Sequence, residues 1–149
     1  MFFLKELPSR ATLETYAKTY KQMNVEAVQA GLVLMRRASL LEREIEAYFA
    51  DYELSQLRFH ILIVIDREVA RDSLTMTEIL ARIDVSKPVM TRTLSGLETQ
   101  GLITIMGDEK DKRLKHVCLT KMGKDKLHAV LPGYHALINH MMQEGENVL

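Results

Sequence analysis

Apolar residues recur every three or four positions over several stretches of the chain, the spacing that places them on one face of a helix. The longest stretch runs from Val25 to Tyr52 and predicts a long amphipathic helix. A second stretch begins after Ser55, which can cap a helix, and continues to about Val69. Its apolar residues lie on more than one side, so we expect this second helix to be buried.

The next start signal is the pair Thr75 and Glu78. A threonine hydroxyl and a glutamate carboxylate at this spacing can satisfy each other's free backbone amides, an arrangement called a capping box. Ile79, Leu80 and Ile83 follow at core spacing. The pattern therefore predicts a short helix that begins at this pair.

A further helix is expected from Ser86, which can serve as its N-cap, to Gly101, which can end it in a left-handed conformation. Pro88 lies in the first turn, where the missing amide proton costs nothing. The spacing predicts that one face of this helix lies in the core and that the other is exposed. The core-facing residues are Met90, Leu94 and Leu97.

The period then changes to two, which is typical of strands. Residues 103–106 and 115–119 alternate between apolar and polar side chains, and a charged stretch at 107–113 separates them. This pattern predicts a β-hairpin with a long polar tip. From Thr120 the spacing is helical again, and we expect Pro132-Gly133 to kink or divide this last helix.

Composition places the chain among ordinary globular domains. Its 149 residues include 20 basic and 20 acidic side chains, for a formal net charge of zero, and 47% are hydrophobic. The charge is unevenly distributed, because residues 40–56 carry five acidic side chains and one basic, whereas residues 84–126 carry nine basic and six acidic. Any binding of nucleic acid must therefore depend on local charge.

No apolar run approaches the roughly 18 residues of a membrane span, and the apolar start is followed at once by charged residues, so we expect a cytoplasmic protein. The single cysteine, Cys118, cannot form an internal disulfide. Its place in a predicted strand favours a small buried hydrophobic role over oxidant sensing.

Catalytic and metal-binding motifs are not found in the sequence. The seven glycines are isolated, and no serine, histidine and aspartate form a recognisable catalytic signature, so we expect no enzyme activity and no cofactor. His128 and His135 are spaced to share a helix face, with His60 and His140 elsewhere, but no acidic or cysteine cluster accompanies them. We therefore expect no metal site.

A helix, a tight turn, a helix with an exposed face and then a two-stranded hairpin is the order of elements in a winged helix-turn-helix. The predicted fold class is mainly α with a small β-hairpin wing (α+β). A helix fits the major groove of B-DNA, and an adjacent hairpin can reach the backbone or a minor groove. The alternative is a winged helix that binds protein rather than DNA, whose binding would lack the steep salt dependence of DNA binding.

Five stretches of the chain follow one another in the order of a known set of motifs. They are Leu74–Leu80, Val85–Arg92, Leu97–Leu102, Asp111–Arg113 and Leu119–Gly123. Over roughly Leu54 to Leu127 the chain thereby resembles the MarR family of bacterial transcription regulators. The resemblance implies a regulator, more often a repressor than an activator, that binds a pseudo-palindromic duplex DNA operator as a homodimer.

The resemblance also implies which residues contact DNA. On the recognition helix they are Ser86, Lys87, Pro88, Val89, Thr91, Arg92 and Ser95. On the wing they are Lys110, Asp111, Lys112 and Arg113. In the family's wing motif the acidic residue braces the loop and the arginine enters the minor groove. Two departures from the family pattern are Pro88, which replaces a small polar residue and removes a donor, and Lys112, which stands where arginine is common.

The same resemblance implies N-terminal dimerisation helices at 1–53, the winged helix-turn-helix at 54–120 and a C-terminal dimerisation helix at 121–149, within one compact structural domain. An amphipathic piece from Thr12 to Met23 is expected to extend the first helix. It can line the dimer interface or pack on its own subunit.

In this family an effector pocket lies between the dimer helices and the winged domain, and such pockets are mostly apolar with a few polar anchors. By their elements, Arg36, Phe59 and His60 are candidates to bind a small aromatic or anionic effector. A surface arginine and a packed histidine explain two of these residues equally well.

Overall fold

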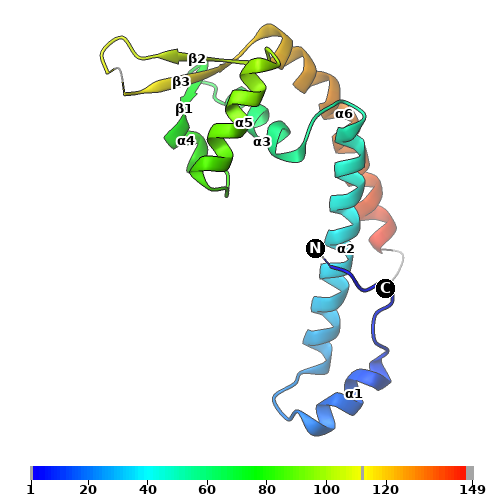
Figure 1. Ribbon diagram of the computed structural model, residues 1–149. Helices are drawn as coiled ribbons and strands as arrows, with labels where there is room; N and C mark the ends of the chain where they lie inside the picture. Colours follow the sequence, from blue (N-terminus) through cyan, green and yellow to red (C-terminus); the bar gives the residue numbers. More distant parts are fainter. Residues whose placement is uncertain (1, 112, 147–149) are drawn as a thin grey trace. The chain divides into compact units, whose positions relative to one another are not determined.

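The computed structural model describes residues 2–111 and 113–146. It divides into two compact units, one within residues 1–45 and 137–149 and the other at 46–136. Figure 1 shows the elements, which in chain order are α1 (Arg10–Thr19), α2 (Val25–Ala50), α3 (Gln56–Asp66), β1 (Ser73–Thr75), α4 (Met76–Leu80), α5 (Lys87–Thr99), β2 (Ile103–Gly107), β3 (Lys115–Leu119) and α6 (Lys121–Glu146).

In the first unit, α1 is a separate helix, so the prediction that it extends the long helix is wrong. The reason is a second start signal, because the Asn24 side chain accepts a hydrogen bond from the Ala27 amide at 2.8 Å and caps α2. Leu13 of α1 is buried at 3% exposure and packs on its own subunit. Tyr16 and Tyr20 of the same helix remain 54% and 52% exposed.

The core of the second unit is built around α3. Its N-cap is Ser55, as predicted, and the Ser55 hydroxyl accepts a hydrogen bond from the Arg58 amide. Phe59 is 1% exposed, and its ring centroid lies 4.6 Å from that of Phe49 and 4.7 Å from that of Tyr134. The buried helix expected from the sequence is therefore confirmed, although it ends at Asp66 rather than near Val69.

Helix α6 continues through Pro132 and Gly133, so these two residues do not divide the helix. The side chain of Tyr48 explains why residue 133 is a glycine. Its hydroxyl donates to the carbonyl of Val130 at 2.8 Å, and a Cβ added at Gly133 would collide with the Tyr48 ring and oxygen. The glycine is thus required by the packing of Tyr48 on this helix, and the helix tolerates the missing Pro132 amide.

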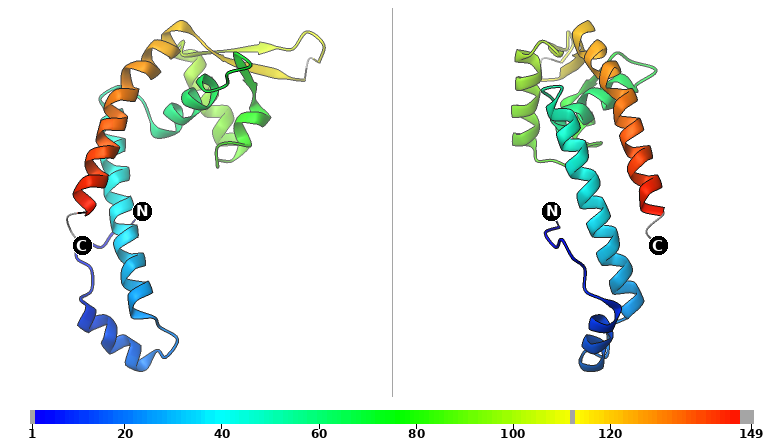
Figure 2. Two further views of the ribbon diagram at one scale, coloured as in Figure 1. Left: turned by 180° about the vertical axis from the view of Figure 1, so that it is seen from behind. Right: turned by 90° about the vertical axis from the view of Figure 1, so that its right-hand side faces the viewer.

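The wing is a three-stranded antiparallel sheet in the order β1-β3-β2 (Figure 1), and Figure 2 shows its β2–β3 hairpin from behind. The predicted hairpin is confirmed in β2 and β3, with Ile105 opposite Val117. Strand β1, which pairs with β3 by placing Leu74 opposite Val117, is missing from the sequence prediction. It has only three residues, too few for an alternating pattern to be recognised.

The turn between α5 and β2 is closed by two glycines. Gly101 has a φ of 72°, the left-handed conformation predicted for it. The Thr120 hydroxyl donates to the Gly101 carbonyl at 2.6 Å and accepts from the Gly123 amide at 3.0 Å. A Cβ at Gly123 would collide with the Leu102 carbonyl, so this glycine lets the start of α6 lie directly on the turn.

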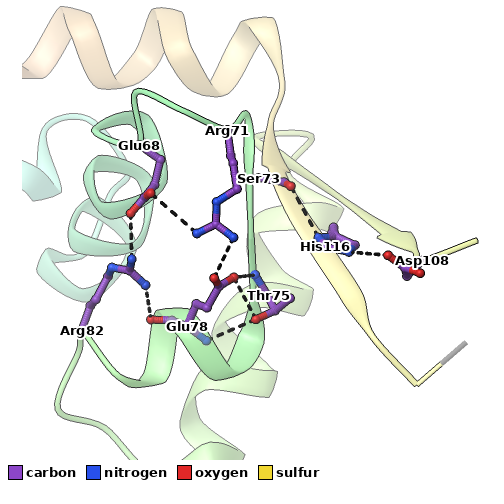
Figure 3. Close-up of polar contacts among 8 residues, drawn as sticks. All are labelled: Glu68, Arg71, Ser73, Thr75, Glu78, Arg82, Asp108 and His116. Carbon is purple, nitrogen blue, oxygen red and sulfur yellow. Dashed lines mark hydrogen bonds and ion pairs between the residues drawn. The ribbon is translucent and has the colours of Figure 1, made fainter. Parts of the chain in front are cut away.

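A cluster of charged side chains holds α4 in place (Figure 3). The predicted capping box is present, because the Thr75 amide donates to the Glu78 carboxylate at 2.8 Å and the Thr75 hydroxyl accepts from the Glu78 amide. Arg71 pairs with the same carboxylate at 2.7 Å, while Arg82 pairs with Glu68 at 2.9 Å. The Thr75 amide, followed by the Arg71 guanidinium, lowers the pKa of Glu78 to about 2.

We expect Glu78→Gln to weaken the acid dependence of stability. The folded-state pKa of Glu78 lies below its ordinary value of 4.5, so its contribution to stability is present above pH 4.5 and is lost as the pH falls toward 2. The free energy of unfolding, measured by urea denaturation between these pH values, should therefore fall less steeply in Glu78→Gln than in the wild type. Glu109→Gln is the control, and equal slopes for Glu78→Gln and the wild type would contradict the prediction.

Candidate nucleic-acid interface

Helix α5 has one buried face and one exposed face. Met90, Leu94 and Leu97 are at most 1% exposed, which confirms that they belong to the core. Because these three residues fix the rotation of the helix about its axis, the opposite face must point to solvent. All the residues predicted for DNA contact on this helix are exposed, namely Ser86, Lys87, Pro88, Val89, Thr91, Arg92 and Ser95.

Five of these residues line an open surface depression along the helix. They are Lys87, Pro88, Thr91, Arg92 and Ser95, which follow one another at helical spacing. Neither Lys87 nor Arg92 forms an ion pair with any other described residue. The structure therefore brings together two cations, a proline ring and two hydroxyl groups on one accessible surface.

The first turn of α5 differs from the prediction in one respect. Ser86 occupies the N-cap position, but its hydroxyl makes no capping hydrogen bond. An N-cap side chain bonds the amide of the second or third helical residue, and because the second residue here is Pro88, only the Val89 amide is left as a capping partner. The Ser86 hydroxyl is exposed and can bond a group outside the chain.

Threonine hydroxyls on α5 are turned toward the helix backbone. The hydroxyl of Thr91 donates to the carbonyl of Lys87 at 2.9 Å, and that of Thr93 donates to the carbonyl of Val89 at 2.8 Å. The Thr91 hydroxyl proton is therefore occupied, although its oxygen can still accept a hydrogen bond. The charged donors on this surface are the two cations, Lys87 and Arg92.

The loop at the tip of the wing is organised by Asp108, one of the six acidic side chains at residues 84–126. One carboxylate oxygen of Asp108 accepts the amides of Lys110 at 2.7 Å and Asp111 at 2.8 Å. Its other oxygen lies 3.0 Å from Nε2 of His116. The Asp111 amide, then that of Lys110 and then His116 lower the pKa of Asp108.

His116 connects this loop to the rest of the sheet, as Figure 3 shows. The residue lies in the central strand β3, opposite Met106 on one side and Thr75 on the other. Its Nδ1 lies 3.5 Å from the Ser73 hydroxyl on β1, while its Nε2 contacts Asp108. Sequence reasoning gave His116 no role, because its partners come together only when β1 joins the sheet.

The remaining predicted wing residues lie where the loop turns back. Asp111 accepts a hydrogen bond from the Arg113 amide at 2.9 Å, so it braces the loop in the way that the resemblance implies. Lys110 and Arg113 are exposed, and neither forms an ion pair with a residue that the structure describes. Lys112 lies outside the described residues.

The three effector candidates have different surroundings. Phe59 belongs to the aromatic core, whereas the neighbouring His60 is half-buried and lines a pocket between α3 and the turn after α4. Burial lowers the pKa of His60. Arg36 belongs to the other unit, where its Nη1 is buried and has no hydrogen-bond partner among the described residues.

Metal ligands, a reactive thiol and membrane-spanning helices are three further features that could give the described part of the chain a function. Residues 2–111 and 113–146 contain no group of three histidine, cysteine, aspartate or glutamate side chains that could hold a metal ion. Cys118 is partly buried in β3, and burial raises the pKa of its thiol, which disfavours the reactive thiolate. No helix in this part of the chain is long and apolar enough to cross a membrane.

Helices α4 and α5 and the β2–β3 wing form a winged helix-turn-helix, the class of domain that places a helix in the major groove of DNA. A profile of the MarR family matches residues 52–114. The HTH-type transcriptional repressor YetL of Bacillus subtilis is 30% identical over 140 residues, which cover 94% of this chain and 83% of YetL. The chain belongs to the MarR family of DNA-binding transcriptional regulators.

Further similarities agree with this assignment. The HTH-type transcriptional regulator PecS of Dickeya dadantii is 27% identical over 122 residues, covering 82% of this chain and 67% of PecS. The fold is similar to that of AbsC from Streptomyces coelicolor, with a TM-score of 0.75, 19% identity and 82% of each chain covered. It is equally similar, at a TM-score of 0.75 and 20% identity, to Sco3205 from the same organism, solved in complex with DNA, with 82% of this chain and 79% of that one covered.

We expect Asp108→Ala to loosen the wing loop. Without the carboxylate, the amides of Lys110 and Asp111 lose their acceptor, so their hydrogen exchange with deuterium should become about fivefold faster. Amide exchange measured by NMR tests this, with Glu109→Ala as the control because Glu109 accepts neither amide. Unchanged exchange at both amides would show that Asp108 does not hold the loop.

Proposed function

We propose that this chain represses transcription as a homodimer that binds a pseudo-palindromic operator through its two α5 helices. The observation that carries the proposal is the exposed face of α5, where Lys87 and Arg92 form no ion pair with any residue that the structure describes and lie beside exposed hydroxyl groups. Such cations can bind phosphates and base edges without first breaking a contact within the protein. The name of YetL as a repressor favours repression over activation.

In the proposed complex, the start of α5 enters the major groove. Lys87 reaches base edges, Arg92 and the Ser86 hydroxyl hold phosphates, and Thr91 accepts a hydrogen bond through its oxygen. Ser95 lies one turn further along the same depression. Phosphate contacts fix the register of the protein, and base contacts supply the sequence preference.

The wing supplies the second contact. Arg113 is proposed to enter the adjacent minor groove, where a guanidinium is attracted by the negative potential. Asp108 and Asp111 hold the backbone around it through the amides that they accept, and Lys110 adds positive charge. Lys112 is included in this surface on the basis of the sequence alone.

Dimer formation is proposed from the exposed apolar side chains of the first unit. Leu34 and Met35 on α2 are 69% and 49% exposed. Tyr16 and Tyr20 on the preceding helix α1 are exposed as well. We infer that a second copy of the chain covers these side chains. The residues concerned are Tyr16, Tyr20, Val28, Leu34, Met35 and Met142. Two-fold symmetry then requires half-sites about 10 base pairs apart.

Selection from random DNA duplexes, performed with the full chain at two salt concentrations, tests this proposal. We expect a two-fold symmetric site with half-sites about 10 base pairs apart and an affinity that falls steeply as salt rises. Recovery of an unsymmetric site would contradict the dimer, and salt-independent binding would contradict the proposed phosphate contacts.

Arg113→Ala is expected to weaken binding to the selected operator. Loss of one cation should lower the slope of log affinity against log salt by about one. Lys18→Ala on α1 is the control for loss of a positive charge elsewhere. Fluorescence anisotropy over a salt series gives the slope, and an unchanged slope in Arg113→Ala would count against the wing contact.

Leu34→Glu is expected to weaken dimerisation at least tenfold. A glutamate at this position would place a charge in an apolar interface, where no partner compensates its loss of hydration. Sedimentation velocity over a concentration series measures the dissociation constant. Lys21→Glu, also exposed and in the same unit, is the matched control. A Leu34→Glu dimer as tight as the wild type would exclude this face.

An anionic aromatic effector remains part of the proposal. The pocket beside His60 combines apolar side chains with Arg67, Arg82 and Asp84. Arg82 is paired with Glu68, so we assign Arg67 to the carboxylate of a bound aromatic ring. Benzoate is a suitable probe, and we expect it to bind at millimolar concentration and to bind His60→Ala more weakly in calorimetry. Equal binding of benzoate by the wild type and by His60→Ala would show that the effector binds elsewhere.

Since the proposed target is chromosomal DNA in bacteria, we place this activity in the cytoplasm.

A further inference from the structure

The first turn of α5 carries two adjacent exposed apolar side chains, Pro88 and Val89. They follow the first residue of the helix, and Val89 is 41% exposed. Pro88 also lines the open depression, together with the two cations Lys87 and Arg92. An apolar pair at the tip of a helix that enters DNA is therefore placed to meet base edges directly.

The side chains of Pro88 and Val89 offer no hydrogen-bond donor. Pro88 has neither an amide proton nor a polar side chain. The hydroxyl of Thr91 donates to the carbonyl of Lys87 and that of Thr93 to the carbonyl of Val89, which leaves the Ser86 hydroxyl and the two cations as the side-chain donors beside this pair. A base that lies against Pro88 and Val89 thus meets hydrocarbon, and donors are found only at the margins.

The base edges of the major groove differ in what they present to such a surface. Guanine and adenine present acceptors that need a donor, and cytosine presents an amino group that needs an acceptor. Thymine alone presents a methyl group, which gains from apolar contact. The edges of all four bases lose hydration against such a surface, including O4 of thymine, but only thymine gains contact with a methyl group in return.

We propose that Pro88, with Val89 beside it, selects thymine at one position in each half-site by contact with the 5-methyl group. This inference rests on the proposed entry of α5 into the major groove. The flanking cations Lys87 and Arg92 bind the neighbouring phosphates and base edges, and they hold the proline ring against the methyl group. Burial of one methyl group corresponds to about fourfold in affinity, and two symmetry-related methyl groups to about 15-fold.

Replacement of thymine by deoxyuridine in the selected operator isolates the methyl group, because uracil keeps the same Watson–Crick edge and lacks only this group. The full-length protein is titrated with duplexes that carry uracil at one symmetric pair of thymine positions at a time. We expect one pair to lower the affinity about 15-fold and the other pairs to have little effect. The same pair should have a much smaller effect in Pro88→Ala and a reduced effect in Val89→Ala.

Ser95→Ala is the matched control, since Ser95 lies in the same depression and has no role in the methyl contact. It should retain the full ratio between thymine and uracil duplexes, whatever its effect on overall affinity. Circular dichroism and thermal unfolding verify that each variant is folded, and Val89→Ala serves as the test should Pro88→Ala fail to fold.

The outcomes separate this inference from the proposed function. Tight, salt-dependent binding of a fully uracil-substituted operator with unchanged affinity would overturn the methyl contact and leave the proposed DNA binding intact. A uracil effect that persists undiminished in Pro88→Ala and Val89→Ala would overturn the assignment to these residues. A chain that binds no DNA duplex in the selection would overturn the proposed function itself.

Discussion

Burial of one face of α5 is the constraint on which the functional surface depends. Met90, Leu94 and Leu97 fill the core of the second unit, so the helix cannot rotate without exposing them to water. Each of these side chains contributes about 1.5–3 kcal/mol when fully buried. The exposure of Lys87 and Arg92 is therefore a consequence of core packing, and substitutions on the exposed face can change recognition without loss of the fold.

The short elements around α5 must also be held in position. Polar contacts hold them, because such short elements have too little apolar area to be held by burial alone. Helix α4 has only five residues, too few to be stable alone, and it is held by the capping box of Thr75 and Glu78 and by Arg71. In the wing loop, the Asp108 carboxylate holds the backbone by accepting two amides. His116 joins these two regions because β3 lies between β1 and β2.

Local signals in the sequence predicted most of this fold. The capping box, the left-handed Gly101 and the buried stripe of α5 depend on residues within four positions of one another, and all three are confirmed. Features that depend on distant residues were missed. Strand β1 has too few residues for a periodic pattern, and the requirement for Gly133 comes from Tyr48, more than 80 positions earlier in the chain. The roles of Asp108 and His116 likewise appear only after the sheet has formed.

A protein of zero net charge can still bind a polyanion when its acidic side chains are paired within the protein and some of its basic side chains are not. Near α4, the carboxylates of Glu68 and Glu78 are paired with arginines at 2.7–3.7 Å, so their negative charge is compensated locally. The cations of α5 and of the wing tip have no such partner among the described residues, and they can displace counterions from DNA directly. The salt dependence of binding is then set by the number of these unpaired cations, and the formal net charge of the chain says little about it.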